Sequence, residues 1–445
     1  MSSGISCMAD YSEKNLKKNS VLLAVYKAVS MVLSMLYVPV ILGYLGTGLY
    51  GIWATILNVI SWVNYFDIGI GNGLRNKLSA ALAKDADDSK VKSLISSAYV
   101  LLSVVVLGVM AVALVVFQFI DWNALLNIPE SLYGNAKAVV AVSFALMCIG
   151  FVFSICKSLF FAVQEAHIVS LLGVAQQACM LMSVLTLGLF DSDRLMSVAI
   201  AYGLSALLIE LSFTFTFFRK RRPWVPTPMA YDKGMARDVT GLGVQFFIIQ
   251  MASLVLSSTD NVIVSNIFGP EAVTPYSTAF KLFTVPVSLY ASMISPYWSS
   301  ITARYARGDV SGIKGNVRHM EKLLALPATC CFVLALAYTP ITDIWLGQHL
   351  DTSTDLVWLM FAYCLVYSWN AIWSQVSNGM ACMKMMMALA VGQAIANIPL
   401  SYLFAGMLGS SSGVMLGTIV TMLSSSVVYP VYINRKLAKE SAIEQ

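Results

Sequence analysis

The chain has 445 residues, of which 58% are hydrophobic and 11% are charged, and its formal net charge is +5. Soluble domains carry about 25% charged residues, so this composition excludes an ordinary soluble domain and predicts a polytopic membrane protein. The positions of the cations matter more than their sum, because Lys and Arg gather in the cytoplasmic loops of membrane proteins.

Apolar runs of about 20 residues, long enough to cross a hydrocarbon core, recur along the chain. Residues 1–19 are polar and lack the short apolar core of a cleavable signal, so the first span is expected to be retained. The first half predicts spans at 20–45, 50–73, 94–119, 136–162, 168–190 and 195–218. The second half predicts spans at 240–268, 276–302, 322–346, 356–380, 385–407 and 413–434. The fold class is therefore an all-α membrane protein with twelve transmembrane helices.

A basic, proline-rich stretch separates the two sets of spans. The four cations Arg219–Arg222 are followed by three prolines within six residues. Four consecutive cations cannot cross a bilayer, and the prolines cannot continue a helix. We expect a six-helix bundle over residues 1–218, a basic cytoplasmic linker over 219–238 and a second six-helix bundle over 239–445.

The cations also predict the orientation of the chain. Most of the 28 Lys and Arg residues fall in segments that share one side if the N-terminus is cytoplasmic, so both termini are predicted to be cytoplasmic. Six spans per half make the seventh helix enter from the same side as the first. Any repeat is then parallel, with a pseudo-two-fold axis along the membrane normal.

Motifs of soluble enzymes are missing. His167, His319 and His349 are isolated, so the sequence contains neither an HExxH motif nor a local metal cluster. The glycines of Asp67–Gly73 resemble a phosphate loop, but no Lys-Ser/Thr pair follows, and a glycine-loosened helix end explains them better. We expect no enzyme activity, metal, cofactor or nucleic-acid partner.

Ionisable residues within the spans are more informative. A charge at the centre of a span costs about 2.5 to 3.5 kcal/mol, so these side chains should face the bundle interior or a wet cavity. Depth along the helices allows two pairs, although each is explained equally well as an internal structural tie. The first pair is Lys27 with Asp67, and the second is Asp260 with Lys281.

Lys157 and Glu210 complete this set of ionisable residues. Lys157 has no acid nearby in the sequence, and Glu210 is the only acid at comparable depth. A lysine that is not locally neutralised is the better candidate for an anionic ligand such as a diphosphate. Asp67, Glu210 and Asp260 are candidates for exchanging a proton or sodium ion as their surroundings alternate in wetness.

The tenth predicted span carries aromatic and amide side chains near its middle, although Trp and Tyr normally collect at membrane interfaces. Flat aromatic faces beside amide groups suit the binding of sugar rings, for which Tyr367, Asn370 and Trp373 are the candidates. Helix packing through polar contacts, worth under about 1 kcal/mol each, explains any one of these residues equally well.

Short motifs across essentially the whole chain resemble one family. They are Tyr44–Trp53, Asp67–Arg75, Thr259–Asn261, Phe268-Gly269, Tyr276 with Lys281, Asn378-Gly379 with Lys384, and Asn397–Leu400. Together they resemble the Wzx-type O-antigen flippases of the multidrug/oligosaccharidyl-lipid/polysaccharide exporter (MOP) superfamily. The sequence departs from the family pattern at Met380–Met383, which puts a role for Lys384 in doubt.

This resemblance implies a MATE-like fold, in which two six-helix bundles face each other across a V-shaped cavity. It also implies a substrate, an undecaprenyl-diphosphate-linked oligosaccharide moved from the cytoplasmic to the periplasmic leaflet of a bacterial inner membrane by alternating access. Cations of the cavity would contact the diphosphate: Lys27, Arg75, Lys157 and Lys281. Expected partners are membrane lipids, H⁺ or Na⁺, a polysaccharide polymerase and a chain-length regulator.

Two other classes of protein remain open. A multidrug antiporter has the same architecture, but an acid-dominated cavity would favour it, whereas three lysines offset three acids here. A membrane enzyme such as a polymerase would normally need a large outer loop, and the outer segments 120–135 and 347–355 are short.

Overall fold

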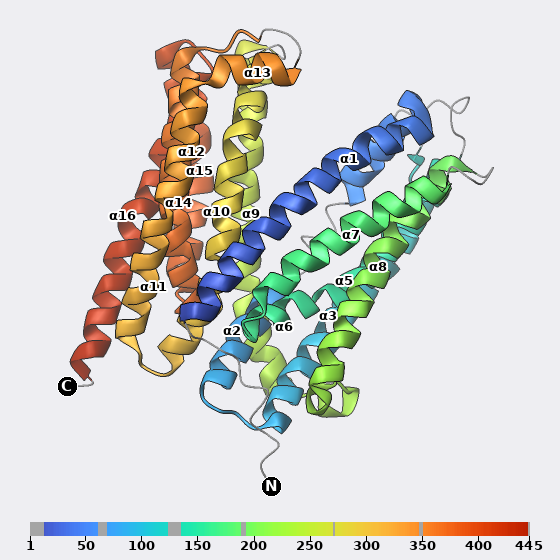
Figure 1. Cartoon of the computed structure of the whole chain (residues 1–445), viewed down its shortest axis with the longest axis vertical. Helices are drawn as coiled ribbons and strands as arrows, with labels where there is room; N and C mark the ends of the chain where they lie inside the picture. The colour runs from blue at the N-terminus through green and yellow to red at the C-terminus, as the bar shows by residue number, and fades with distance from the viewer. Residues whose placement is uncertain are drawn as a thin grey trace. The chain divides into compact units, whose positions relative to one another are not determined.

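The computed structural model describes residues 13–60, 69–122, 135–187, 193–269, 272–346 and 350–443 (Figure 1). Within these ranges the chain is helical and contains no strand, which confirms the all-α fold class. It divides into two compact units, Met1–Val244 and Gln245–Gln445.

The first unit begins with α1, which is interrupted at Gly46, where φ is 73°. Glycine adopts this left-handed conformation without the steric penalty of a Cβ atom, so two apolar helices join here across a single residue. Figure 1 shows α1, α7 and α8 running alongside one another. The helices are α1 (Glu13–Ile60), α2 (Ile70–Ala83), α3 (Asp88–Phe119), α5 (Ala136–Ser154), α6 (Cys156–Ala162), α7 (Ala166–Leu187) and α8 (Arg194–Lys220).

One long helix, α9, begins in the first unit and continues in the second. In the second unit α10 packs on α14, and α16 packs on both α14 and α15 (Figure 1). The helices are α9 (Lys233–Phe268), α10 (Val273–Ala306), α11 (Val310–Leu323), α12 (Ala325–Leu336), α13 (Tyr338–Leu346), α14 (Thr354–Gly379), α15 (Met383–Leu408) and α16 (Ser412–Ile443).

Ten segments of the described chain are long and apolar enough to cross a membrane, which agrees with a multi-pass membrane protein. The predicted span 50–73 runs through residues 61–68, outside the described ranges. The predicted span 276–302 corresponds to α10, which is not one of the ten segments. The count of twelve spans, the parallel repeat and the cytoplasmic termini stay predictions.

The candidate segment in this region overlaps the ninth predicted span, 322–346, but has other bounds. The membrane-length segment runs from Val310 to Leu336, through α11 and α12, and α13 then turns across its end (Figure 1). Hydropathy placed α13 in the span because Ile341, Ile344 and Trp345 are apolar. It could not detect the change of direction at Ala337, where φ is −106° and ψ is 19°.

Residues 219–238, the predicted linker, lie within the first unit and pack on α3 through two 3₁₀ turns, Arg222–Trp224 and Pro228–Ala230. The Trp224 indole donates a 2.7 Å hydrogen bond to Asp88, and the Asp232 amide donates a 3.0 Å bond to the Ser97 hydroxyl. These bonds order a segment whose prolines prevent a continuous helix.

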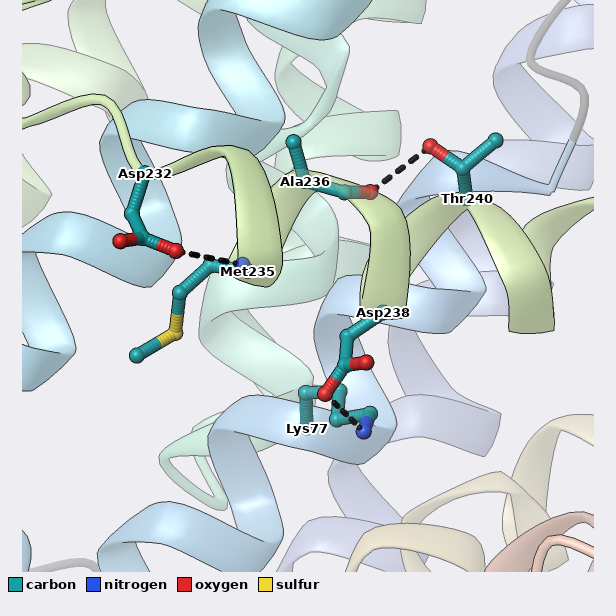
Figure 2. Close-up of polar contacts among 6 residues, drawn as sticks. All are labelled: Lys77, Asp232, Met235, Ala236, Asp238 and Thr240. Atoms are coloured by element: carbon teal, nitrogen blue, oxygen red, sulfur yellow. Dashed lines mark hydrogen bonds and ion pairs between the residues drawn. The ribbon is translucent and has the colours of Figure 1, made fainter.

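Figure 2 shows how the first turns of α9 are held. An Asp232 carboxylate oxygen accepts a 2.7 Å hydrogen bond from the Met235 amide and so caps the helix. Lys77 of α2 forms a 2.8 Å ion pair with Asp238. A Cβ atom at Gly73 of α2 would lie 2.6 Å from the Val239 carbonyl oxygen, so only glycine fits beside this backbone.

Candidate functional site

In the first unit, Lys157 and Glu210 form an ion pair across the break between α5 and α6. The Lys157 ammonium lies 2.8 Å from Glu210 Oε1 on α8. The Thr214 hydroxyl, one turn further along α8, donates a 3.4 Å bond to the Phe153 carbonyl at the same break. The prediction that Lys157 is not locally neutralised is therefore wrong, because the fold brings the one acid at comparable depth against it.

The two partners of this ion pair differ in accessibility. The Lys157 side chain is 36% accessible, whereas the Glu210 side chain is 7% accessible. Removing one partner of such a buried pair leaves an uncompensated charge and is strongly destabilising. Exchange of a proton or sodium ion by Glu210 stays a prediction.

Arg75 of α2 contacts α6, the helix that carries Lys157. Its guanidinium sits 4.2 Å from the centroid of the Phe161 ring, and Phe161 follows Lys157 by one helical turn. Burial lowers the pKa of Arg75 to about 9, so the side chain is still a cation at neutral pH. Two of the four predicted diphosphate-binding cations are thus associated with α6: Lys157 is part of this helix, and Arg75 of α2 stacks on its Phe161 ring.

The other two cations predicted to bind the diphosphate, Lys27 and Lys281, have different surroundings. Lys27 is half-buried on α1, and its predicted partner Asp67 lies outside the described residues, so that pair stays a prediction. Lys281 is exposed on α10 and makes no ion pair with Asp260, although both residues are described. The predicted Asp260–Lys281 pair is therefore wrong.

Asp260 instead lies in a buried network of uncharged polar groups in the second unit. It accepts a 2.9 Å hydrogen bond from the Tyr276 hydroxyl and bonds of 3.1 and 3.2 Å from the Thr418 hydroxyl. Thr418 accepts a 2.9 Å bond from the Asn397 amide, whose oxygen accepts a 3.4 Å bond from Thr259. Within the described chain, no Lys or Arg lies within ion-pair distance of this carboxylate.

The candidate sugar-binding residues on α14 have different surroundings. Asn370 is buried, and its amide donates to the Met422 carbonyl at 3.1 Å and accepts from Ser426 at 2.9 Å, which ties α14 to α16. The Trp373 ring is buried against Trp369, with centroids 5.9 Å apart. Tyr367 remains 38% exposed and packs beside Tyr363. Sugar binding by these three residues stays a prediction.

The sequence indicated only part of the Asp260 network. Tyr276 and Asn397 belong to the motifs of the resemblance, but nothing in the sequence associated them with Asp260. Thr418 was not singled out, because a lone threonine in an apolar helix is ordinary. Its role follows from contacts between residues 158 positions apart.

Comparisons with known proteins agree with this architecture. Residues 16–302 match the family model described as polysaccharide biosynthesis protein. A protein of Salmonella typhimurium named "Putative O-antigen transporter" is 20% identical over 391 residues, covering 86% of this chain and 87% of its own length.

Solved structures share the fold. A MOP superfamily transporter from Pyrococcus furiosus superposes with a TM-score of 0.77 at 12% identity, covering 96% of this chain and 97% of its own. A multidrug resistance MATE family transporter in an outward-facing conformation gives a TM-score of 0.74 at 14% identity, with the same coverage. The protein is thus a multi-pass membrane protein with a MATE-like fold, and it belongs to the polysaccharide biosynthesis protein family.

Proposed function

We propose that the protein moves undecaprenyl-diphosphate-linked oligosaccharide repeat units from the cytoplasmic to the periplasmic leaflet of a bacterial inner membrane by alternating access. Transport rather than catalysis agrees with the family match and with the name of the Salmonella relative. The match to the family model over residues 16–302 is the observation that carries this proposal.

In the first unit, Lys157 and Arg75 are proposed to bind the diphosphate. Both are cations: Lys157 lies on α6, and Arg75 of α2 stacks on Phe161, one helical turn after Lys157. Arginine binds phosphate oxygens through a planar fork and lysine as a point charge, so the two groups complement each other. Contacts of Lys27 and Lys281 with the diphosphate, and of Tyr367, Asn370 and Trp373 with the sugars, belong to the same proposal.

Ion coupling is proposed at Asp260 in the second unit, where H⁺ or Na⁺ would bind the carboxylate. The Tyr276 and Thr418 hydroxyls donate to it, the Asn397 amide donates to Thr418, and an ion pair does not neutralise it in the described structure. A buried carboxylate without a partner cation is costly, so binding of an external cation is favoured. Oxygen ligands from Asp, Thr and Asn suit a hard cation.

Complementation tests both parts of the proposal. A strain that lacks the gene should lose surface polysaccharide, and the wild-type chain should restore it. Asp260→Asn keeps the size of the side chain but removes its charge, so we expect polysaccharide export to fall by about tenfold or more, the scale of an interaction of about 1.4 kcal/mol.

The outcomes separate the alternatives. Tyr402→Phe, an exposed hydroxyl on α15, serves as the matched control and should restore export fully. A deletion strain with normal surface polysaccharide but raised drug sensitivity would favour multidrug extrusion instead. Export that is indifferent to collapse of both the proton and the sodium gradients would exclude ion coupling.

A further inference from the structure

The ion pair between Lys157 and Glu210 joins an accessible lysine to a buried acid. One bond of 2.8 Å joins the two side chains. The lysine is 36% accessible and the acid 7%, so a ligand can reach the cation without reaching its partner. The second carboxylate oxygen faces α5, where a Cβ atom at Gly150 would lie only 3.6 Å away.

In the described part of the first unit, Lys157 is the one cation within ion-pair distance of Glu210. The charged and titratable groups that act on it are Lys157 and Cys156 on α6 and Tyr99 on α3. Thiols and phenols are neutral at physiological pH, so Lys157 alone supplies positive charge. A ligand that draws the lysine away therefore leaves a buried carboxylate beside an incoming anion.

We propose that an anionic diphosphate ligand opens the Lys157–Glu210 ion pair and that Glu210 takes up one proton as the ligand binds. The inference rests on the proposed function, because it assumes a diphosphate substrate. The charges balance in a simple way: the ammonium transfers its contact from the carboxylate to the diphosphate, and a proton from solution neutralises the carboxylate. Apolar surroundings disfavour the charged form of a carboxylate, and so does a second anion beside it, so the unpaired Glu210 carboxylate binds a proton more readily.

Binding and protonation are then thermodynamically linked. A ligand that increases proton uptake must bind more tightly as the proton concentration rises. Affinity for the diphosphate should therefore fall by about tenfold per pH unit over the range in which Glu210 is ionised in the free protein and protonated in the complex. Glu210→Gln removes the competing charge and the titrating group together, so it should bind tightly and without this pH dependence.

The first unit also supplies a matched control. Arg221 and Glu165 form an ion pair of the same 2.8 Å length, but there the cation is the less accessible partner, at 7% against 28% for the acid. An anionic ligand therefore reaches Arg221 less readily than Lys157. Glu165→Gln removes a carboxylate of the same type from the same unit and should leave the pH dependence of diphosphate binding unchanged.

Calorimetry of the full-length protein in nanodiscs measures the number of protons taken up per ligand bound. Undecaprenyl diphosphate is the probe, and each titration is repeated near pH 6, 7 and 8 in two buffers that differ in ionisation heat. The expected result is uptake of about one proton per ligand by wild type and by Glu165→Gln, and about none by Glu210→Gln. The difference from Glu210→Gln corrects for protonation of the probe itself.

Other results would overturn the inference. Binding of the probe by wild type without net proton uptake would contradict the inference. It would not contradict the proposed transport, which the surface-polysaccharide assay tests separately. An affinity for the probe that is independent of pH in Glu165→Gln as well as in Glu210→Gln would also contradict the inference. If wild type fails to bind the probe at all three pH values, the inference and the diphosphate substrate fall together. If Glu210→Gln does not fold, protonation of the probe is measured in protein-free nanodiscs, and wild-type proton uptake no greater than that background would contradict the inference.

Discussion

Asn370 and Tyr367 lie one turn apart on α14 but differ in their surroundings. The buried Asn370 amide uses its oxygen and its nitrogen in bonds to α16, whereas Tyr367 is 38% exposed. Both residues were candidates for sugar contact, because sequence composition cannot distinguish an amide that packs helices from one that faces a ligand. The structure favours Tyr367 as the accessible group.

Substitution should separate these two roles. Asn370→Ala removes the two hydrogen bonds that tie α14 to α16, so the free energy of unfolding should fall by about 1 to 3 kcal/mol. Tyr367→Ala should leave stability nearly unchanged and reduce polysaccharide export. Thermal unfolding of the purified variants and surface-polysaccharide assays measure the two effects. An Asn370→Ala variant with normal stability and lost export would instead indicate direct contact with substrate.

At the scale of helices, close backbone approach holds α15 against α16. A Cβ atom at Gly413 would lie 2.2 Å from the Phe404 carbonyl oxygen, and one at Gly417 would lie 2.6 Å from the Ser401 Cα. Small residues four positions apart allow membrane helices to pack this closely, where lipid offers no hydrophobic driving force. Thr418 and Asn397, which complete the Asp260 network, lie on these two helices.

Gly417→Val should therefore disturb both the packing and the network. The added side chain forces the helices apart, which costs about 1 to 3 kcal/mol or more, and moves Thr418 away from Asp260. We expect lower thermal stability together with weaker ion dependence of export. Gly406→Val on α15 is the control, because nothing lies within 4 Å of a Cβ atom there. Equal losses in both variants would show that helix propensity, not packing, is responsible.

For the whole molecule, the distribution of cations predicts that both termini are cytoplasmic. Arg435, Lys436 and Lys439 follow the last apolar run, and Lys14, Lys17 and Lys18 precede the first. Translocation of such clusters is unfavourable, so a membrane protein orients to retain them inside.

Reporter fusions test this orientation. Green fluorescent protein fused after Gln445 should fluoresce, and alkaline phosphatase at the same position should be inactive, because each reporter matures on one side of the membrane only. A fusion after Leu350, in the predicted outer segment, should give the reverse result. Active phosphatase at Gln445 would contradict the predicted topology and the even number of spans.

The sequence by itself determined the membrane class, the all-α fold and the approximate positions of most spans. These properties follow from composition and local hydropathy, which act within one helix. Tertiary structure decided which charges meet: Lys157 pairs with Glu210 across 53 positions, and Asp260 bonds to Thr418 across 158. Depth along separate helices suggested Lys281 as the partner of Asp260, but the choice depends on how each helix is rotated about its axis and packed. That rotation is fixed by contacts between different helices, such as the contact of Gly417 with Ser401.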